Sequence, residues 1–377
     1  MNSRQRVLTA LSHKEPDQVP IDLGGTENST VARIAYLNLR DHLGLPEEPQ
    51  PVVINRMMDV VFPQEDLLQR FGVDFRPIQP QPAWQPELRE LPDDSFYDEF
   101  GIRWKKAAYY YDMVEHPLQY CSLAEIIAFR YPDPYAPGRV AGLREQAKRL
   151  YERNDYAIVL ADIVWGPFEL GCALRGYEQF CMDLLQDVRL AETLLDKNLE
   201  LALGFWEAYL TEAGEYIQIV GLGDDLAMQI GPIISPNTYR KLIKPRHTQL
   251  IDMIHTKPDA QIFMHCCGSV YDLLPDLIET GIEILNPVQV SAAKMDLVRL
   301  KHDFGDQLSF WGGGVDTQQV LPYASLPEIR DHVCRAFDIL APGGGFVFAP
   351  VHNIQADIAP DRILAVYEAA LECRKYR

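Results

Sequence analysis

The stretch Gln261-Ile-Phe-Met-His-Cys-Cys-Gly-Ser269 decides how the rest of the chain is interpreted. Mostly apolar residues lead into a His, two Cys and a Gly, a pattern typical of a buried strand that ends in a turn. Because strand side chains alternate between faces, we expect His265 and Cys267 to point the same way and Cys266 the opposite way. An imidazole beside a thiol supplies two zinc ligands, although an isolated His-x-Cys is more often core packing, and a metal site needs further donors.

Short apolar runs alternate with helical periodicity along the chain, which predicts an α/β protein. Runs buried on both faces and joined by helices indicate a parallel sheet, and eight of them favour a (β/α)8 TIM barrel. A doubly wound open sheet is the alternative, but Gly343-Gly-Gly345 precedes a strand and is not a dinucleotide-binding loop. The predicted strands are 18–22, 73–78, 156–161, 216–220, 261–265, 282–286, 308–311 and 345–349. The predicted helices are 3–12, 29–42, 63–71, 140–154, 176–184, 187–213, 236–257, 269–280, 294–304 and 326–340.

Residues 79–135 break this alternation. They are rich in Pro, and Ser95–Lys105 has the pattern of a small hairpin. The segment has too few apolar residues to fold alone, so we predict an insertion over the barrel mouth within one domain, residues 1–377.

Composition limits the classes of function. The chain has 377 residues, of which 47% are hydrophobic, and a formal net charge of −19. Such acidity disfavours nucleic-acid binding, because phosphates would be repelled. No apolar run has the length of a membrane span, and the first residues do not resemble a signal peptide. The seven Cys lack the spacing of a disulfide framework, which predicts reduced thiols and a cytoplasmic protein.

Polar side chains follow nearly every predicted strand. In a (β/α)8 barrel the active site lies at the carboxyl ends of the strands, so these residues predict a small-molecule site there. Simpler roles exist for some of them: Asp224, Asp225 and Asp316 can cap helices, and Arg76 can pair with a carboxylate. The strand-end residues are Asp22, Arg76, Trp165, Asp224, Asp225, Gln229, His265, Cys267, Asn286, Gln289, Asp316, His352 and Asn353.

Several motifs together resemble the uroporphyrinogen decarboxylase superfamily, whose members are (β/α)8 barrels. The resemblance extends over essentially the whole chain. Its motifs are Glu15-Pro-Asp-Gln-Val-Pro20, Asp225 with Ile234-Ser-Pro236, Met264-His-Cys-Cys-Gly-Ser269, Trp311-Gly-Gly-Gly-Val-Asp316 and Phe348-Ala-Pro-Val-His-Asn-Ile354.

The superfamily implies two kinds of chemistry. True uroporphyrinogen decarboxylases use an Arg-rich N-terminal loop and a strand-end Asp, whereas here Asp22-Leu-Gly-Gly-Thr26 lacks Arg and the strand 73–78 runs into Gln79. The other branch contains zinc-dependent methyltransferases that work with a corrinoid, and their ligands are a His-x-Cys and a Cys at the last strand. His265 and Cys267 match that pair, and His352 stands near the place of the last Cys.

The resemblance therefore implies a zinc-dependent methyltransferase that moves a methyl group between a methyl ether or thiol and a methyl-corrinoid on a separate protein, with a homodimer as one possible assembly. The alternatives are a cofactor-free decarboxylase of the tetrapyrrole type and a small-molecule-binding barrel without catalysis. The expected metal ligands are His265, Cys267 and His352. The expected catalytic residues are Asp225, Asp316 and His352. The expected substrate contacts are Arg76, Trp165, Gln229, Asn286, Gln289 and Asn353.

Overall fold

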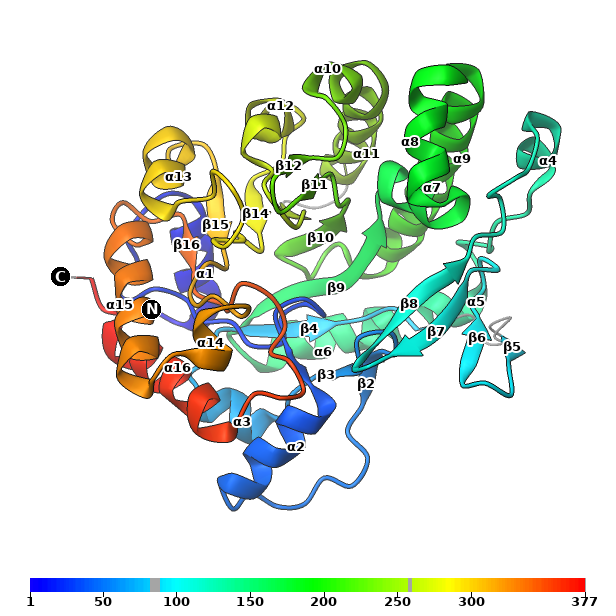
Figure 1. The fold of residues 1–377 in the computed structure, drawn as a ribbon. Helices are drawn as coiled ribbons and strands as arrows, with labels where there is room; N and C mark the ends of the chain where they lie inside the picture. Colours follow the sequence, from blue (N-terminus) through cyan, green and yellow to red (C-terminus); the bar gives the residue numbers. More distant parts are fainter. Residues whose placement is uncertain (82–88, 257–259, 377) are drawn as a thin grey trace.

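A curved parallel sheet surrounded by helices forms the centre of the molecule (Figure 1). The computed structural model describes residues 1–81, 89–256 and 260–376. Seven strands pair side by side in the order β16-β15-β14-β13-β10-β9-β4, and every pairing is parallel. Their bounds are Phe75–Ile78 (β4), Ala157–Trp165 (β9), Ile219–Gly223 (β10), Gln261–His265 (β13), Ile284–Asn286 (β14), Ser309–Trp311 (β15) and Phe346–Val347 (β16).

The predicted first strand closes this sheet into a barrel. Ile21 forms a parallel bridge with Phe348, next to β16. On its other side, the backbone N–H of Asp74 donates to the carbonyl of Ile21 at 2.9 Å, next to β4. The (β/α)8 barrel is therefore confirmed, and the doubly wound open sheet is not.

The helices follow the outside of the barrel and include one near each predicted helix. The first begins as predicted, because the Asn2 side chain accepts from the backbone of Gln5 and the Gln5 side chain accepts from the backbone of Asn2. Among the longer helices, the sequence patterns missed Pro167–Arg175 (α7) and Pro360–Cys373 (α16). The main helices are Ser3–Leu11 (α1), Arg33–His42 (α2), Glu65–Arg70 (α3), Leu143–Arg153 (α6), Pro167–Arg175 (α7), Tyr177–Gln186 (α8), Val188–Ala213 (α9), Lys244–His255 (α11), Leu274–Glu279 (α12), Leu297–Phe304 (α13), Leu326–Leu340 (α15) and Pro360–Cys373 (α16). The short ones are Leu123–Ala128 (α4), Pro137–Val140 (α5), Pro236–Thr238 (α10), the 3-10 turn Tyr271–Leu273 (η2) and Val320–Tyr323 (α14).

The helix predicted over 236–257 is interrupted. A π-helical turn, Tyr239–Ile243 (η1), separates α10 from α11. Pro245 follows this turn and has no N–H to donate to the preceding carbonyls, so a regular α-helical ladder cannot continue through it. Residue 257 lies outside the described residues.

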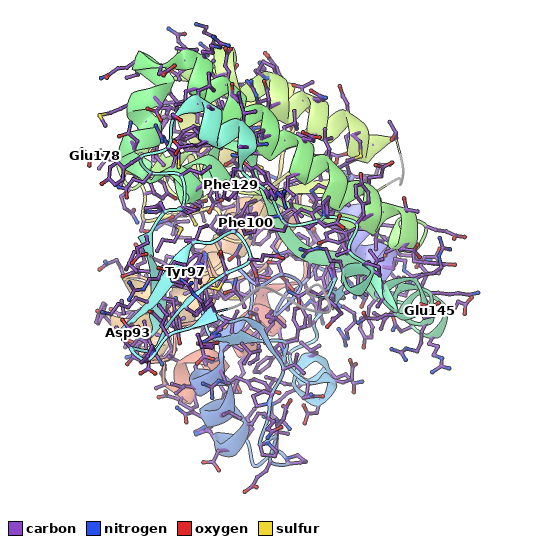
Figure 2. The ribbon with its side chains drawn as sticks, turned by 90° about the vertical axis from the view of Figure 1, so that its right-hand side faces the viewer. Asp93, Tyr97, Phe100, Phe129, Glu145 and Glu178 are labelled. Atoms are coloured by element: carbon purple, nitrogen blue, oxygen red, sulfur yellow. A yellow bond between two sulfur atoms is a disulfide. The ribbon has the colours of Figure 1, made fainter. Side chains whose placement is uncertain are left out.

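The predicted insertion contains an antiparallel four-stranded sheet, larger than the hairpin expected from the sequence. Its order is β5-β6-β7-β8. In the pairing of β6 with β7, Ser95 lies opposite Lys105 and Tyr97 lies opposite Arg103. Asp93 and Tyr97 mark this sheet in Figure 2. The bounds are Arg89–Glu90 (β5), Ser95–Tyr97 (β6), Arg103–Ala107 (β7) and Tyr110–Glu115 (β8). The part of the insertion at 82–88 lies outside the described residues.

Two smaller sheets lie next to the barrel. The first joins Val31–Ala32 (β1), Val60–Val61 (β3) and Val53–Asn55 (β2). The second is the hairpin of Ala227–Met228 (β11) with Gly231–Pro232 (β12), which follows β10 directly. Both sheets lie on connections that follow barrel strands, and Asn55 of β2 reaches the cavity described below.

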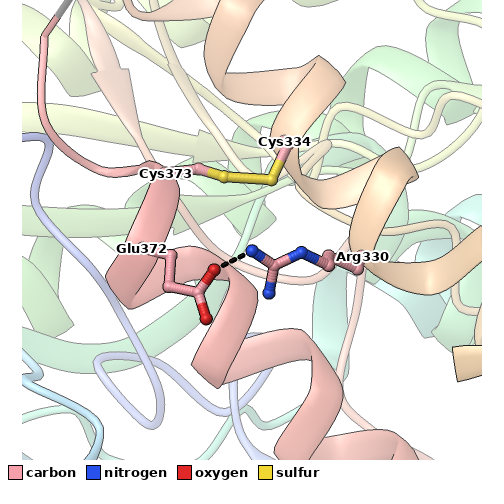
Figure 3. Close-up of a disulfide and its surroundings, with 4 residues drawn as sticks. All are labelled: Arg330, Cys334, Glu372 and Cys373. Atoms are coloured by element: carbon pink, nitrogen blue, oxygen red, sulfur yellow. Dashed lines mark ion pairs between the residues drawn. A yellow bond between two sulfur atoms is a disulfide. The ribbon is translucent and has the colours of Figure 1, made fainter. Parts of the chain in front are cut away.

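A disulfide joins the last two long helices. Cys334 of α15 bonds Cys373 of α16, and Arg330 forms an ion pair with Glu372 beside it (Figure 3). The prediction of reduced thiols is therefore wrong for this pair, because helix packing brings together two Cys that are 39 residues apart. Five other Cys, including Cys266 and Cys267, are free.

No helix among the described residues combines the length and apolar character that crossing a membrane requires.

Candidate metal centre

The end of β13 places an imidazole and a thiol side by side. Cys267 Sγ lies 3.4 Å from His265 Nε2, which confirms that these two side chains share a face. Cys266 points the other way, is 1% exposed and accepts from the backbone N–H of Leu226, so it belongs to the core as expected. The alternation of strand side chains explains both placements.

The loop after β16 brings a third donor to the same place. The His352 ring lies 5.5 Å from the His265 ring, centre to centre, in an edge-to-face arrangement. The ligand atoms of His265, Cys267 and His352 all lie within 4.8 Å of one another. Residues far apart in the sequence therefore converge at the carboxyl ends of two strands, where a (β/α)8 barrel builds its site.

Amide oxygens orient both imidazole rings. Asn286 Oδ1 lies 2.6 Å from His265 Nδ1, and the Asn286 amide is itself held because its Nδ2 donates to the carbonyl of Trp311 at 2.9 Å. Asn353 Oδ1 contacts His352 Nδ1 in the same way. An amide oxygen can only accept, so each Nδ1 carries a proton, and in the neutral ring Nε2 keeps its lone pair. Nε2 of each ring is thus the atom available to bind a metal ion.

Backbone contacts fix the loop that carries the thiol. The N–H of Cys267 donates to Asp225 Oδ1 at 2.7 Å, and the N–H of Gly268 donates to Gln289 Oε1 at 2.7 Å. Gly268 has φ of +86°, and a Cβ there would lie 2.7 Å from the carbonyl oxygen of Met228. Only glycine fits this turn, which explains the Gly after the two Cys.

The three donors fit a zinc ion. Zinc takes thiolate and imidazole ligands at about 2.3 and 2.0 Å, which in a tetrahedral site separates sulfur from nitrogen by about 3.5 Å. The separation of 3.4 Å between Cys267 Sγ and His265 Nε2 agrees with this value. Burial raises the pKa of the Cys267 thiol well above its usual range, and the carboxylate of Asp225 adds to this shift. A bound cation is what would hold this sulfur as a thiolate.

The donors open into a cavity of about 710 Å³. Its walls combine carboxylates with aromatic rings, and none of the described residues that line it is Lys or Arg. The carboxylates belong to Glu27, Glu169, Asp225 and Asp357. The aromatic rings belong to Trp104, Tyr109, Tyr110, Tyr111, Trp165 and Tyr323.

Several predicted site residues line this cavity, whatever their roles. They are Trp165, Asp225, His265, Cys267, Gln289, His352 and Asn353. Asn286 does not line it, because its side chain is fully buried between His265 and Trp311, where it orients a ligand. Gln229 lies outside as well and bonds Gln318.

Two predicted site residues have other roles. Arg76 is 5% exposed, forms a paired contact with Glu65 at 2.7 and 2.8 Å, and lies over the ring of Tyr156. Its neighbour Phe75 packs on Trp311, so the alternation of β4 turns Arg76 away from the barrel interior. Asp316 accepts from the backbone N–H groups of Gln318 and Gln319 and stabilises a turn. The structure therefore contradicts the expected substrate contact of Arg76 and gives Asp316 the capping role.

Sequence reasoning missed part of the cavity wall. Glu169 lies in the first turn of α7. The carboxylate of Asp224 caps this turn, because it accepts from the backbone N–H groups of Phe168 and Glu169. Gly166-Pro167 after β9 was the available signal, since Pro often occupies the first helical position. Glu27, Asp357 and Tyr109–Tyr111 come from loops and the insertion, where periodicity gives no signal.

The fold and these donors define a (β/α)8 barrel with a candidate metal centre at its mouth. The chain belongs to the uroporphyrinogen decarboxylase (URO-D) family, whose model matches residues 111–373. No curated protein sequence matches the chain significantly.

Among solved structures, a methyltransferase from Methanosarcina mazei is similar over 99% of both chains, with a TM-score of 0.64 and 19% sequence identity. That likeness supports the fold. A beta-glucosidase from Pyrococcus furiosus has 10% identity over 83% of each chain and a TM-score of 0.43. A putative vitamin-B12 independent methionine synthase from Listeria monocytogenes has 12% identity, covers 94% of this chain and 98% of its own, and has a TM-score of 0.40. Neither of these two similarities is high enough to support an inference.

Proposed function

We propose that this chain is a zinc-dependent methyltransferase that moves a methyl group between a small substrate, a methyl ether or a thiol, and a corrinoid carried by a separate protein. The observation that carries the proposal is the set of three donors, with both histidines oriented through Nδ1 so that each Nε2 faces the ligand position. Similarity of fold to a methyltransferase is consistent with it.

His265, Cys267 and His352 would hold the zinc ion. Bound there, zinc supplies a Lewis acid that keeps a substrate sulfur as a thiolate or makes the oxygen of a methyl ether a better leaving group. Three protein ligands leave one position for substrate, the arrangement typical of catalytic zinc.

Other side chains of the chain support these donors. Asn286 and Asn353 keep the proton on Nδ1 of each imidazole. The carboxylate of Asp225 fixes the backbone N–H of Cys267. Burial raises the pKa of Asp225, and the nearby charge of Asp224 adds to this shift. Trp165 and the tyrosines of the insertion sheet cover part of the cavity and would exclude water from the reacting atoms.

The absence of Lys and Arg from the described cavity lining argues against the decarboxylase alternative. A tetrapyrrole substrate with many carboxylates needs cationic anchors, and Arg is the side chain best suited to carboxylate recognition. The carboxylates of the wall would repel such a substrate.

Metal content per chain is the first test. We expect about one zinc per wild-type chain after purification without chelator. We also expect its loss in His265→Ala and Cys267→Ser, while Cys121→Ser, a change at a free thiol outside the cavity, keeps zinc. Transfer of a methyl group to or from added cobalamin is then assayed on the zinc-containing protein. A wild-type chain that holds no zinc even after zinc is added would refute the proposal.

A further inference from the structure

The cavity carries acidic side chains in addition to the three candidate metal donors. Four carboxylates line it, and no Lys or Arg among the described lining residues offsets them. Glu169, Asp225 and Asp357 form no ion pair with any described side chain. A zinc ion bound with one thiolate adds a single net positive charge, so the cavity stays negative even when one carboxylate is protonated.

Three of these carboxylates crowd one another. Glu169 Oε2 accepts from the backbone N–H of Asp225 at 3.2 Å. Burial raises the pKa of Glu169 well above its usual range, and the nearby charges of Asp225, Asp224 and Glu27 raise it further. Like charges held together without a cation cost free energy, and a positively charged ligand would relieve that cost.

Aromatic rings line the same cavity. The Trp104 and Trp165 rings are 6.3 Å apart and tilted by 52°, and Phe100 stacks on Trp165 at 6.0 Å. The turn between β7 and β8 adds Tyr109, and the first residue of β8 adds Tyr110, which is held by a hydrogen bond to Gln355. Aromatic faces attract ammonium groups through their quadrupole, most strongly where the site is shielded from water.

We propose that the substrate of this site carries an ammonium group, which lies against the wall of carboxylates and aromatic rings while its reacting oxygen or sulfur faces His265, Cys267 and His352. This inference rests on the function proposed above and names the charge class of its substrate. It excludes small anionic substrates such as carboxylates and sulfonates, because the wall offers them repulsion and no cationic anchor.

Binding of a matched pair of probes tests the inference without methyl transfer. Choline and 3,3-dimethylbutan-1-ol have nearly the same shape, but only choline is charged. We expect zinc-loaded protein to bind choline at least tenfold more tightly in calorimetric titration, the size of a shielded cation–π contact. We expect no binding of the anion propane-1-sulfonate, which has no thiol that zinc could hold. Equal affinity for choline and the alcohol, or binding of the sulfonate tighter than of choline, would overturn the inference.

Variants locate the preference in the wall. In the double variant Glu27→Gln/Asp357→Asn, we expect the preference for choline over the alcohol to fall below threefold. Glu200→Gln removes an exposed carboxylate of α9 outside the cavity and should leave the preference unchanged. A double variant that keeps the full preference counts against the inference. Metal content and methyl transfer are measured separately, so a protein that holds zinc and transfers methyl groups without preferring choline refutes only the charge class.

Discussion

Replacing Asn286 by Leu should weaken zinc binding through the ring of His265. The Asn286 side chain is fully buried and makes two hydrogen bonds, to His265 Nδ1 at 2.6 Å and to the carbonyl of Trp311 at 2.9 Å. Leu has a similar volume but cannot accept from Nδ1, so the imidazole loses its orientation and its fixed tautomer. Loss of such a partner of a metal-ligating His costs about 10–100-fold in metal affinity, or about 1.4–2.8 kcal/mol.

The same change should also destabilise the metal-free protein. It leaves one buried donor and one buried acceptor without a partner, at about 1–3 kcal/mol each. The free energy of unfolding should therefore fall by about 2–6 kcal/mol in urea denaturation. Zinc affinity is measured by competition with a chromophoric chelator.

Asn198 offers a matched control. It is also fully buried, accepts from Tyr131 Oη at 2.6 Å and donates to the carbonyl of Pro167 at 2.9 Å. Asn198→Leu should thus lose a similar amount of stability while its zinc affinity stays at the wild-type value. If Asn286→Leu binds zinc like the wild type, or if both variants lose affinity equally, the assigned role of Asn286 is wrong.

Two further predictions concern the barrel and its outer helices. Burial raises the pKa of Asp22 to about 6, although Trp311 Nε1 and a backbone N–H donate to it. The cost of its ionisation begins just below pH 4 and grows as the pH rises to 6. The unfolding free energy of the wild type relative to Asp22→Asn should therefore fall by about 2.5 kcal/mol between pH 4 and 7. A difference that does not change with pH would contradict this. The disulfide between Cys334 and Cys373 closes a 39-residue span, so a reductant should lower the unfolding free energy of the wild type by about 4 kcal/mol. The double variant Cys334→Ala/Cys373→Ala should not respond to the reductant. A wild type whose unfolding free energy is insensitive to reductant would refute the prediction.

The sequence predicted the barrel and the convergence of His265, Cys267 and His352 because both follow from local rules. Alternation along a strand placed His265 and Cys267 together, and the rule that strand ends converge brought in His352. The same alternation misplaced Arg76, because the sequence does not say which of the two alternating sets of side chains along a strand points into the barrel. In β4 the inward-pointing set includes Phe75, which packs on Trp311, and so excludes its neighbour Arg76.

The rest of the cavity wall depends on packing between distant segments. Glu27 follows the first barrel strand, Asp357 follows the last, and Tyr109 lies at the tip of a hairpin of the insertion. No periodicity in these segments indicates what they face. The disulfide was missed for the same reason, since only the packing of α15 against α16 brings its two Cys together.

The family match covers the candidate metal centre but only part of the cavity wall. The family model matches residues 111–373, which include all three candidate metal donors. Glu27, Trp104, Tyr109 and Tyr110 line the same cavity but precede residue 111. The family match therefore includes the three candidate donors and part of the cavity wall, but not these four residues. A barrel supports many reactions by varying such loops around a constant core, so the proposed charge class of the substrate depends on the wall and not on family membership.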